Sequence, residues 1–167
     1  MKKLGLALLG LALAWPSPAR AQDKAVEVSV GYAFARYLEE GGGSAPVGAY
    51  LSLAGTKRLS IEGDVGWQRD SEDLFGDTIV LNTFTATVGP RLSRRDGKAR
   101  PFAHLLVGVR HDRIEGDSNT ALGGMTGGGV DIPLGGHTAL RLGGDFQIFF
   151  DEGENVKTLR LAAGFTF

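Results

Sequence analysis

Ten ionisable residues recur at alternating positions along the chain, and their types are those that could do chemistry. They comprise five carboxylates, four arginines and one histidine: Glu27, Glu62, Asp64, Arg91, His104, Arg110, Asp131, Arg141, Asp145 and Arg160. Two carboxylates brought together can act as general acid and base. Mixed charges can instead line a pore, or arginine forks can hold carboxylates in paired hydrogen bonds. The elements that position these residues decide between these roles.

Other chemistries have little support in the sequence. The absence of cysteine excludes disulfides, thiolate metal sites, a cysteine nucleophile and a lipid-modified N-terminal Cys. The acidic segment 69–77 lacks the spacing of an EF-hand calcium loop and is typical of a solvated loop, although loose bridging by divalent cations to lipid phosphates stays open. No G-x-x-x-x-G-K segment is present. We therefore expect no cofactor and no metal or nucleotide site.

The first 21 residues have the order of features found in a secretory signal peptide. Lys2 and Lys3 precede an apolar run over 4–14, which is too short for a membrane-spanning helix of about 20 residues. Pro16 and Pro18 follow, and then an A-x-A cleavage site at 19–21. We expect cleavage before Gln22, which leaves one domain over 22–167. The net charge of −1 excludes a strongly basic nucleic-acid binder.

Beyond the leader, apolar residues alternate with small or polar ones, which is the period of a β-strand. Eight segments of roughly 9–11 residues, the length of a tilted membrane strand, follow this pattern or its spacing. Segment 122–132 is the weakest because it is mostly glycine. The segments are 26–35, 47–53, 59–68, 84–91, 103–110, 122–132, 140–148 and 159–167. The sequence therefore predicts an all-β, eight-stranded, antiparallel up-and-down barrel.

The predicted connections alternate in charge. The odd-numbered ones, 39–46, 69–76, 112–119 and 151–155, are acidic. The even-numbered ones are basic or neutral and shorter, with Lys57 and Arg58 in the second, Arg94, Arg95 and Lys98 in the fourth, and a tight turn at 133–136 in the sixth. Since a meander places odd and even connections at opposite ends, long outer loops and short inner turns predict a transmembrane β-barrel.

The ten ionisable residues all lie on the small or polar face of the predicted strands. So many charges do not fit a soluble core, where unpaired charges are very costly, so we interpret this face as the lumen of a membrane barrel. An eight-stranded barrel is only just wide enough for its own side chains. The favoured interpretation is therefore a structural plug of ion pairs, with Asp145 paired to Arg160 or Arg141. A charged pore or a catalytic carboxylate pair remains the alternative.

The chain resembles small outer-membrane β-barrels of the OmpA transmembrane-domain and OmpX type, within the broad outer membrane protein β-barrel domain superfamily. The resemblance covers 25–167 and is strongest at the C-terminus, where 159–167 alternates to a final Phe. Phe165 and Phe167 resemble the signal that the outer-membrane insertion machinery recognises. The other segments that carry it are 28–32, 87–92, 100–104, 127–131 and 140–145. No peptidoglycan-binding domain is expected after Phe167.

The resemblance also directs attention to small barrels that are enzymes. The lipid A deacylase type uses a His and a Ser on its last strands, but the last strands here lack serine and His137 is followed by Thr138. The palmitoyltransferase type uses a His and a Ser near the outer surface, where His111 and Ser118 fall in a predicted acidic loop. Since no nucleophile and base share a rigid site, we expect no enzymatic activity.

We therefore expect a non-enzymatic integral protein of the bacterial outer membrane. Its role would be envelope structure or surface interaction through acidic extracellular loops. The expected partners are outer-membrane lipid and lipopolysaccharide, with the barrel-assembly machinery during insertion, and no nucleic acid; a monomer is expected. The alternatives are a narrow channel for small solutes, a lipid A-modifying enzyme, and a secreted soluble barrel that binds an apolar ligand.

The terminal residue gives a first testable prediction. Deletion of Phe167 removes the last element of the resemblance to the insertion signal, so the variant is expected to accumulate as precursor or aggregate in the periplasm. Fractionation of the cell envelope checks this. Normal outer-membrane levels of the truncated protein would contradict it.

Overall fold

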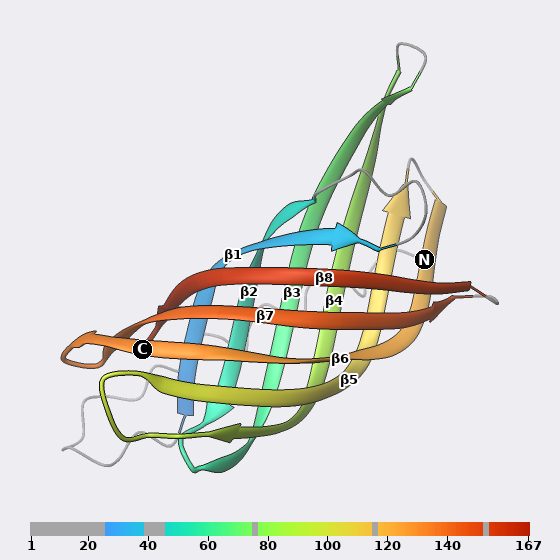
Figure 1. The fold of residues 1–167 in the computed structure, drawn as a ribbon. Coiled ribbons are helices and arrows are strands. Elements are labelled where there is room, and N and C mark those ends of the chain that lie inside the picture. Colours follow the sequence, from blue (N-terminus) through green and yellow to red (C-terminus); the bar gives the residue numbers. More distant parts are fainter. Residues whose placement is uncertain (1–25, 39–45, 75–76, 115–116, 152–153) are drawn as a thin grey trace, which may run out of the picture.

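The computed structural model describes residues 26–38, 46–74, 77–114, 117–151 and 154–167. They form eight antiparallel strands, and the predicted leader 1–21 lies outside them (Figure 1). None of the described residues belongs to a helix long and apolar enough to cross a bilayer. The strands are β1 Val26–Tyr37, β2 Val47–Gly55, β3 Leu59–Leu74, β4 Asp77–Ser93, β5 Arg100–Ile114, β6 Asp117–Gly135, β7 Thr138–Asp151 and β8 Glu154–Thr166.

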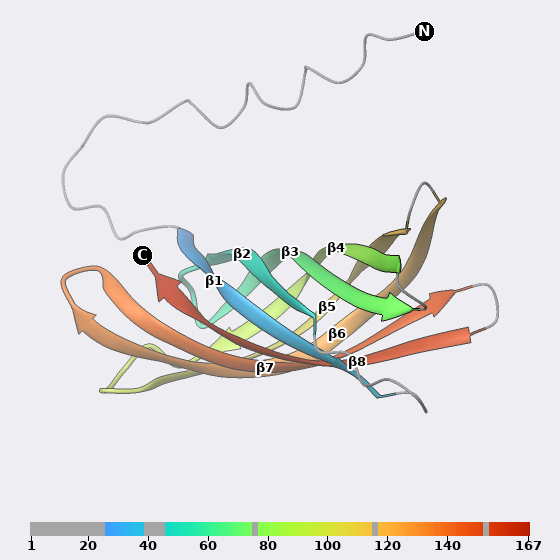
Figure 2. The same ribbon diagram turned by 90° about the horizontal axis from the view of Figure 1, so that it is seen from above.

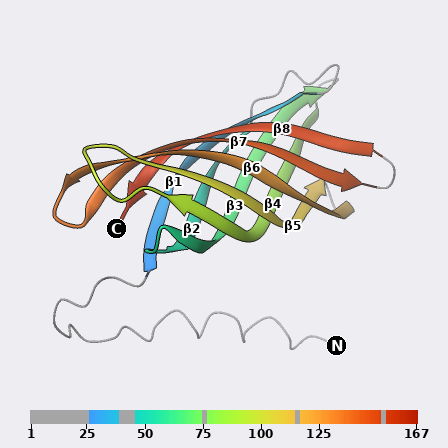
Figure 3. The same ribbon diagram turned by 60° about the horizontal axis from the view of Figure 1, so that its bottom comes forward.

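The strands close into a barrel in which each one pairs with its neighbours in sequence. The last strand pairs with the first, with Ser29 opposite Thr166 and Tyr37 opposite Thr158, so no edge is left open. The views in Figures 2 and 3 show the tilted strands curving around a common axis. The predicted all-β, eight-stranded up-and-down barrel is therefore confirmed.

The two ends of the barrel differ. Val26 lies opposite Gly55, and the backbone of Phe167 exchanges hydrogen bonds with Val28, so both described termini lie at the same end as the β2–β3 connection. The β4–β5 and β6–β7 turns also lie at this end, which we call the terminal end (Figure 1). At the opposite end, called the far end, the β3–β4 hairpin projects beyond the neighbouring strands (Figure 1).

Alternation along the strands separates an apolar outer face from a polar inner face, as predicted. In β1, Val28 and Val30 are exposed outward, whereas Ser29 and Ala33 are buried inside. Many outer residues of the other strands are likewise large and apolar, among them Leu51, Val65, Val88 and Leu161. In water such a surface would be unstable, but it matches the apolar band of a barrel in a bilayer.

Strands reach further toward the far end than the sequence indicated. Segments 69–76 and 112–119 were predicted as connections, but β3 continues to Leu74 and β6 begins at Asp117. The reason is that a two-stranded ribbon satisfies its backbone hydrogen bonds through its own ladder. Such a ribbon needs no apolar face, so the charged segments can remain strand. The tips 75–76, 115–116 and 152–153, and most of the connection 39–46, lie outside the described residues.

The sixth connection is also displaced from its predicted position. Strand β6 runs through Pro133 to Gly135 with an irregular register, and the turn follows at Gly136 and His137. Gly135 and Gly136 have φ angles of 123° and 59°, a backbone conformation that favours glycine. The turn therefore forms where two glycines adopt positive φ angles, and not at Pro133.

The face assignment gives a second prediction. Leu105 lies on the outer face of β5 and is 57% exposed, so a Leu105→Arg substitution places a charge against lipid. We expect a loss of about 2–4 kcal/mol in the free energy of unfolding, measured by urea titration in lipid vesicles.

Leu134 provides the matched control, because it is exposed beside the β6–β7 turn at the barrel rim. Leu134→Arg should cost only about 0–1 kcal/mol, the range for positions near the interface. Equal stability of Leu105→Arg and the parent would show that the faces are reversed.

Candidate functional site

Nine of the ten predicted ionisable residues gather in one cluster inside the barrel. Glu27 is half-buried, and the other eight are buried. We call them the lumen cluster: Glu27, Glu62, Asp64, Arg91, His104, Asp131, Arg141, Asp145 and Arg160. Arg110, the tenth residue, lies apart from it.

Arg160 ties the last strand to both sides of the lumen. Its Nε and Nη2 lie 2.8 and 2.7 Å from Oδ2 of Asp145 on β7. Its Nη1 donates to Oδ1 of Asp64 on β3, across the lumen, at 2.8 Å. The predicted pairing of Asp145 with Arg160 is confirmed. Arg160 also contacts β3, a strand that is not a neighbour of β8.

Arg141 binds Asp131 rather than Asp145, so that alternative pairing is wrong. The two residues lie directly opposite on β6 and β7, and Nε and Nη2 of Arg141 donate to the two carboxylate oxygens at 2.7 and 2.8 Å. Direct cross-strand opposition decides the choice, because Asp145 lies four residues further along β7 from Arg141. Nη2 of Arg91 also donates to Asp131, at 3.1 Å.

His104 joins two carboxylates from different strands. Its Nδ1 lies 2.9 Å from Oε2 of Glu62, and its Nε2 lies 2.8 Å from Oδ1 of Asp145. An ionised carboxylate only accepts hydrogen bonds, so contact with two of them favours the ring form in which both nitrogens donate. Ser52 on β2 donates to the other oxygen of Glu62 at 2.6 Å. With this bond, all eight strands contribute to the cluster.

Aromatic rings support the arginines, a feature that the sequence analysis did not assign. The guanidinium carbons of Arg91 and Arg141 each lie 4.5 Å from the ring centroid of Phe102, which favours cations over its face. Tyr50 supports Arg160 in the same way at 5.9 Å. Strand alternation could have revealed Phe102, because it shares the inward face with His104.

Arg95 was assigned to a basic connection, yet it is part of the ion-pair system. Its guanidinium pairs with Glu27 and also donates to the carbonyl oxygen of Gly55 at 2.9 Å. Nη1 of Arg91 lies 3.7 Å from the second oxygen of Glu27. No spacing rule could have found Arg95, because it follows the end of β4 and reaches back into the barrel.

Two glycines make room for side chains in the lumen. A Cβ atom at Gly127 would lie 2.3 Å from Oδ1 of Asp145, and one at Gly123 would lie 2.8 Å from the ring of Phe149. Contacts that short do not occur, so a larger residue would displace the neighbour. Gly127 and Gly123 therefore leave space for Asp145 and Phe149, and also for the backbone of β7, because the same Cβ atoms would lie 2.3 and 2.1 Å from the carbonyl oxygens of Gly144 and Ile148.

Arg110 belongs to a separate polar group nearer the far end. Its Nε donates to Asp112 at 2.7 Å and its Nη2 to the hydroxyl of Tyr37 at 3.0 Å. Thr83 also donates to Asp112, at 2.5 Å. Asp112 was predicted to lie in the acidic connection 112–119, but it belongs to β5, is half-buried and is bound to Arg110.

An apolar layer lies between the two charged groups along β5 and β7. Leu106 and Phe149 are fully buried, and Met125 pairs with Leu106 across β5 and β6. Nε2 of Gln147 lies 3.6 Å from the sulfur of Met125. The sequence analysis missed this layer because paired apolar residues such as Phe149 and Phe150 conceal the alternation.

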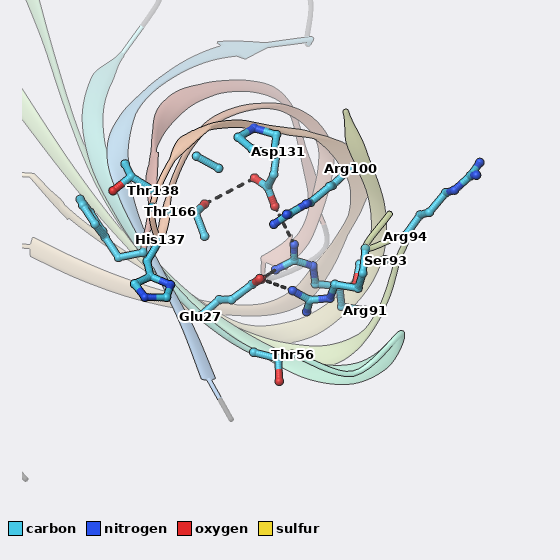
Figure 4. A pocket seen from close by; sticks show the side chains of 15 residues that line it. Glu27, Thr56, Arg91, Ser93, Arg94, Arg100, Asp131, His137, Thr138 and Thr166 are labelled. Carbon is cyan, nitrogen blue, oxygen red and sulfur yellow. Dashed lines mark hydrogen bonds and ion pairs between the residues drawn. The ribbon is translucent and has the colours of Figure 1, made fainter. Parts of the chain in front are cut away.

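Little space remains within the lumen cluster. A cavity of about 20 Å³ lies among Tyr50, Glu62, His104, Arg141 and Arg160, which is room for about one water molecule. A larger cavity of about 220 Å³ opens at the terminal end, where Glu27, Arg91 and Arg100 reach inward (Figure 4). The lumen is thus filled in the middle and hollow at one mouth.

The residues considered for acyl transfer do not form a catalytic pair. Nδ1 of His111 lies 2.8 Å from the hydroxyl of Thr120, whereas Ser118 lies opposite Arg113. His137 is exposed in the β6–β7 turn. Among the described residues, no group of three or more His, Asp or Glu side chains is arranged to hold a metal ion.

Phe165 and Phe167, the predicted assembly signal, both point outward, and about half of each side chain is exposed. The backbone NH of Phe167 donates to the carbonyl of Val28 at 2.9 Å. The last residue therefore takes part in the β1–β8 closure. Its recognition by the insertion machinery stays a prediction.

Solved structures of two outer-membrane proteins have similar folds. NspA, the Neisserial surface protein A, matches with a TM-score of 0.69 and 14% identity over 85% of this chain and 96% of NspA. Ail, the attachment invasion locus protein of Yersinia pestis, matches with a TM-score of 0.58 and 20% identity over 85% of this chain and 97% of Ail. A complex of Ail with the heparin analogue sucrose octasulfate matches with a TM-score of 0.60, 18% identity, and coverage of 85% and 97%.

The sequence itself matches a family model. The model describes the outer membrane protein β-barrel domain and matches residues 5–167. No curated protein sequence matches significantly. The family match and the closed eight-stranded barrel confirm the resemblance that the sequence suggested. The chain therefore belongs to the outer membrane protein β-barrel domain family and is a protein of the bacterial outer membrane.

Proposed function

We propose that the protein is a non-enzymatic structural barrel whose lumen cluster keeps it closed and rigid. The observation that carries this proposal is the continuity of the cluster, which joins residues of all eight strands through contacts across the lumen. Arg160 with Asp64 and Arg91 with Glu27 both connect strands that are not neighbours. Such contacts hold opposite sides of the barrel together. Side chains that only lined a water-filled channel would not need to make them.

The charge balance of the lumen cluster supports the same proposal. Its five carboxylates meet Arg91, Arg141, Arg160 and the imidazolium of His104, and Arg95 adds a fifth cation at Glu27. Removal of one partner from a buried pair typically costs about 3–5 kcal/mol, since the remaining charge is left uncompensated. Loss of any single member of the balanced cluster is therefore expected to destabilise the barrel.

A narrow channel is the alternative, and two features of the lumen count against it. The central cavity of about 20 Å³ has room for about one water molecule. The layer around Leu106, Met125 and Phe149 follows toward the far end, and apolar constrictions of this kind oppose the passage of ions because water leaves them.

Orientation and partners follow from the two ends and the outer face. We place the terminal end in the periplasm, because barrels of this class have short periplasmic turns and longer extracellular loops. The apolar outer face would then contact lipid and the far end would contact lipopolysaccharide, with the protein acting as a monomer. Ail is described as an attachment invasion protein. A surface-interaction role for the far-end hairpins here is the corresponding proposal.

Arg141 distinguishes a plug from a pore. Arg141→Ala leaves Asp131 without its paired hydrogen bonds, so we expect a loss of about 3–5 kcal/mol in the free energy of unfolding. The same preparation should show a higher single-channel current than the parent. Urea unfolding and planar-bilayer recording on one sample provide both measurements.

Two further variants serve as controls. Arg58→Ala removes an exposed arginine from the β2–β3 connection. It should change neither the free energy of unfolding nor the single-channel current. Combining Arg141→Ala with Asp131→Asn should recover part of the stability, but not all of it, because Arg91 also binds Asp131. If Arg141→Ala shifted ion selectivity while stability stayed at the parental value, the lumen would be an open channel and the proposal would fail.

A further inference from the structure

The mouth cavity at the terminal end is lined by several donors that make no hydrogen bond within the described part of the chain. Arg91 is 1% exposed, and its Nε and Nη1 make no hydrogen bond with the described residues, although they lie 3.9 and 3.7 Å from carboxylate oxygens of Glu62 and Glu27. Nε of Arg95, Nε of Arg100 and the hydroxyl of Ser93 also make no hydrogen bond within that part of the chain. All four residues line the cavity of about 220 Å³. Buried donors without partners are costly, so a cluster of them around one cavity indicates a ligand that accepts hydrogen bonds.

Arg100 is a cation that has no carboxylate partner among the described residues. It forms no ion pair or hydrogen bond with any described residue through its side chain, whereas Arg91 and Arg95 both contact carboxylates. Figure 4 shows Arg100 reaching inward between Asp131 and Arg91. Arg94 also lines the cavity, so four arginines there face the carboxylates of Glu27 and Asp131, and the mouth carries excess positive charge.

We propose that this mouth binds a phosphate group, either inorganic phosphate or a phosphomonoester. Arginine forks and hydroxyl groups match the oxygens of a phosphate in charge and geometry. Oε2 of Glu27, buried beside the cavity without a hydrogen-bond partner, adds an acceptor. A phosphate that carries a proton can donate to this oxygen, whereas sulfate has no proton to donate. The site should therefore prefer phosphate to sulfate.

The cavity is accessible from solution at the terminal end. Gly136 and His137, at its rim, are exposed, and Arg100 is half-buried. The site needs neither an open lumen nor the proposed structural role, because it lies outside the filled centre of the barrel. A barrel that conducts ions could still bind phosphate here, and a plugged barrel could fail to do so.

Titration with inorganic phosphate, followed by ³¹P NMR, tests the proposal on protein refolded in a maltoside detergent, which contains no phosphate. The parent should show saturable binding, and Arg100→Gln should weaken it at least tenfold. Arg58→Gln is the matched control, because Arg58 is exposed in the β2–β3 connection and does not line the cavity. It should leave binding unchanged. The heat-dependent gel mobility of each variant checks that it has folded.

Sulfate and a lipid phosphomonoester complete the test. Sulfate should compete at least fivefold more weakly than phosphate. Tighter binding of short-chain phosphatidic acid than of inorganic phosphate would identify a lipid headgroup as the source, and equal binding would identify a soluble phosphate. The proposal is overturned if the parent shows no saturable binding, if Arg100→Gln binds like the parent, if Arg58→Gln weakens binding equally, or if sulfate competes as well as phosphate.

Discussion

The pairing of buried charges inside a narrow closed barrel is the constraint on which the rest of this structure depends. Eight strands leave an interior just wide enough for side chains, and a charge that is enclosed there without a partner is very costly. Each carboxylate of the lumen cluster therefore has an arginine or His104 beside it. The strand register supplies some of these partners directly, as it does for Asp131 with Arg141 and for Asp145 with Arg160.

The other partners come from across the lumen, and this requirement explains features that look unrelated in the sequence. Gly127 has no side chain because Asp145 occupies the space beside it. Phe102 places an aromatic ring against the guanidinium groups of two arginines. The glycine-rich character of β6 makes the strand hard to recognise in the sequence, and at Gly127 the absence of a side chain leaves space for an enclosed charge.

The sequence predicted the architecture well because period-two alternation marks each strand and its lipid face. It also identified nearly all of the lumen cluster, since a charged residue on the inward face can only point into the barrel. It failed where alternation carries no information. The far end of the β5–β6 hairpin is largely polar on both faces, so Asp112 was placed in a connection. Arg95 pairs with Glu27 of the lumen cluster from a position that follows the end of β4. Contacts across the lumen, such as Arg160 with Asp64, depend on barrel closure and cannot be derived from local spacing.

The link between Arg160 and Asp64 also bears on how the chain reaches its final state. These residues are 96 positions apart in the sequence, and Arg160 lies on the last strand. Until β8 docks, Asp64 lacks its arginine and Asp145 keeps only its contact with His104. Docking of the last strand supplies the cation that both carboxylates share, so we expect the last step of folding to be cooperative. The ion pairs thus favour the complete barrel over every partly assembled form of it.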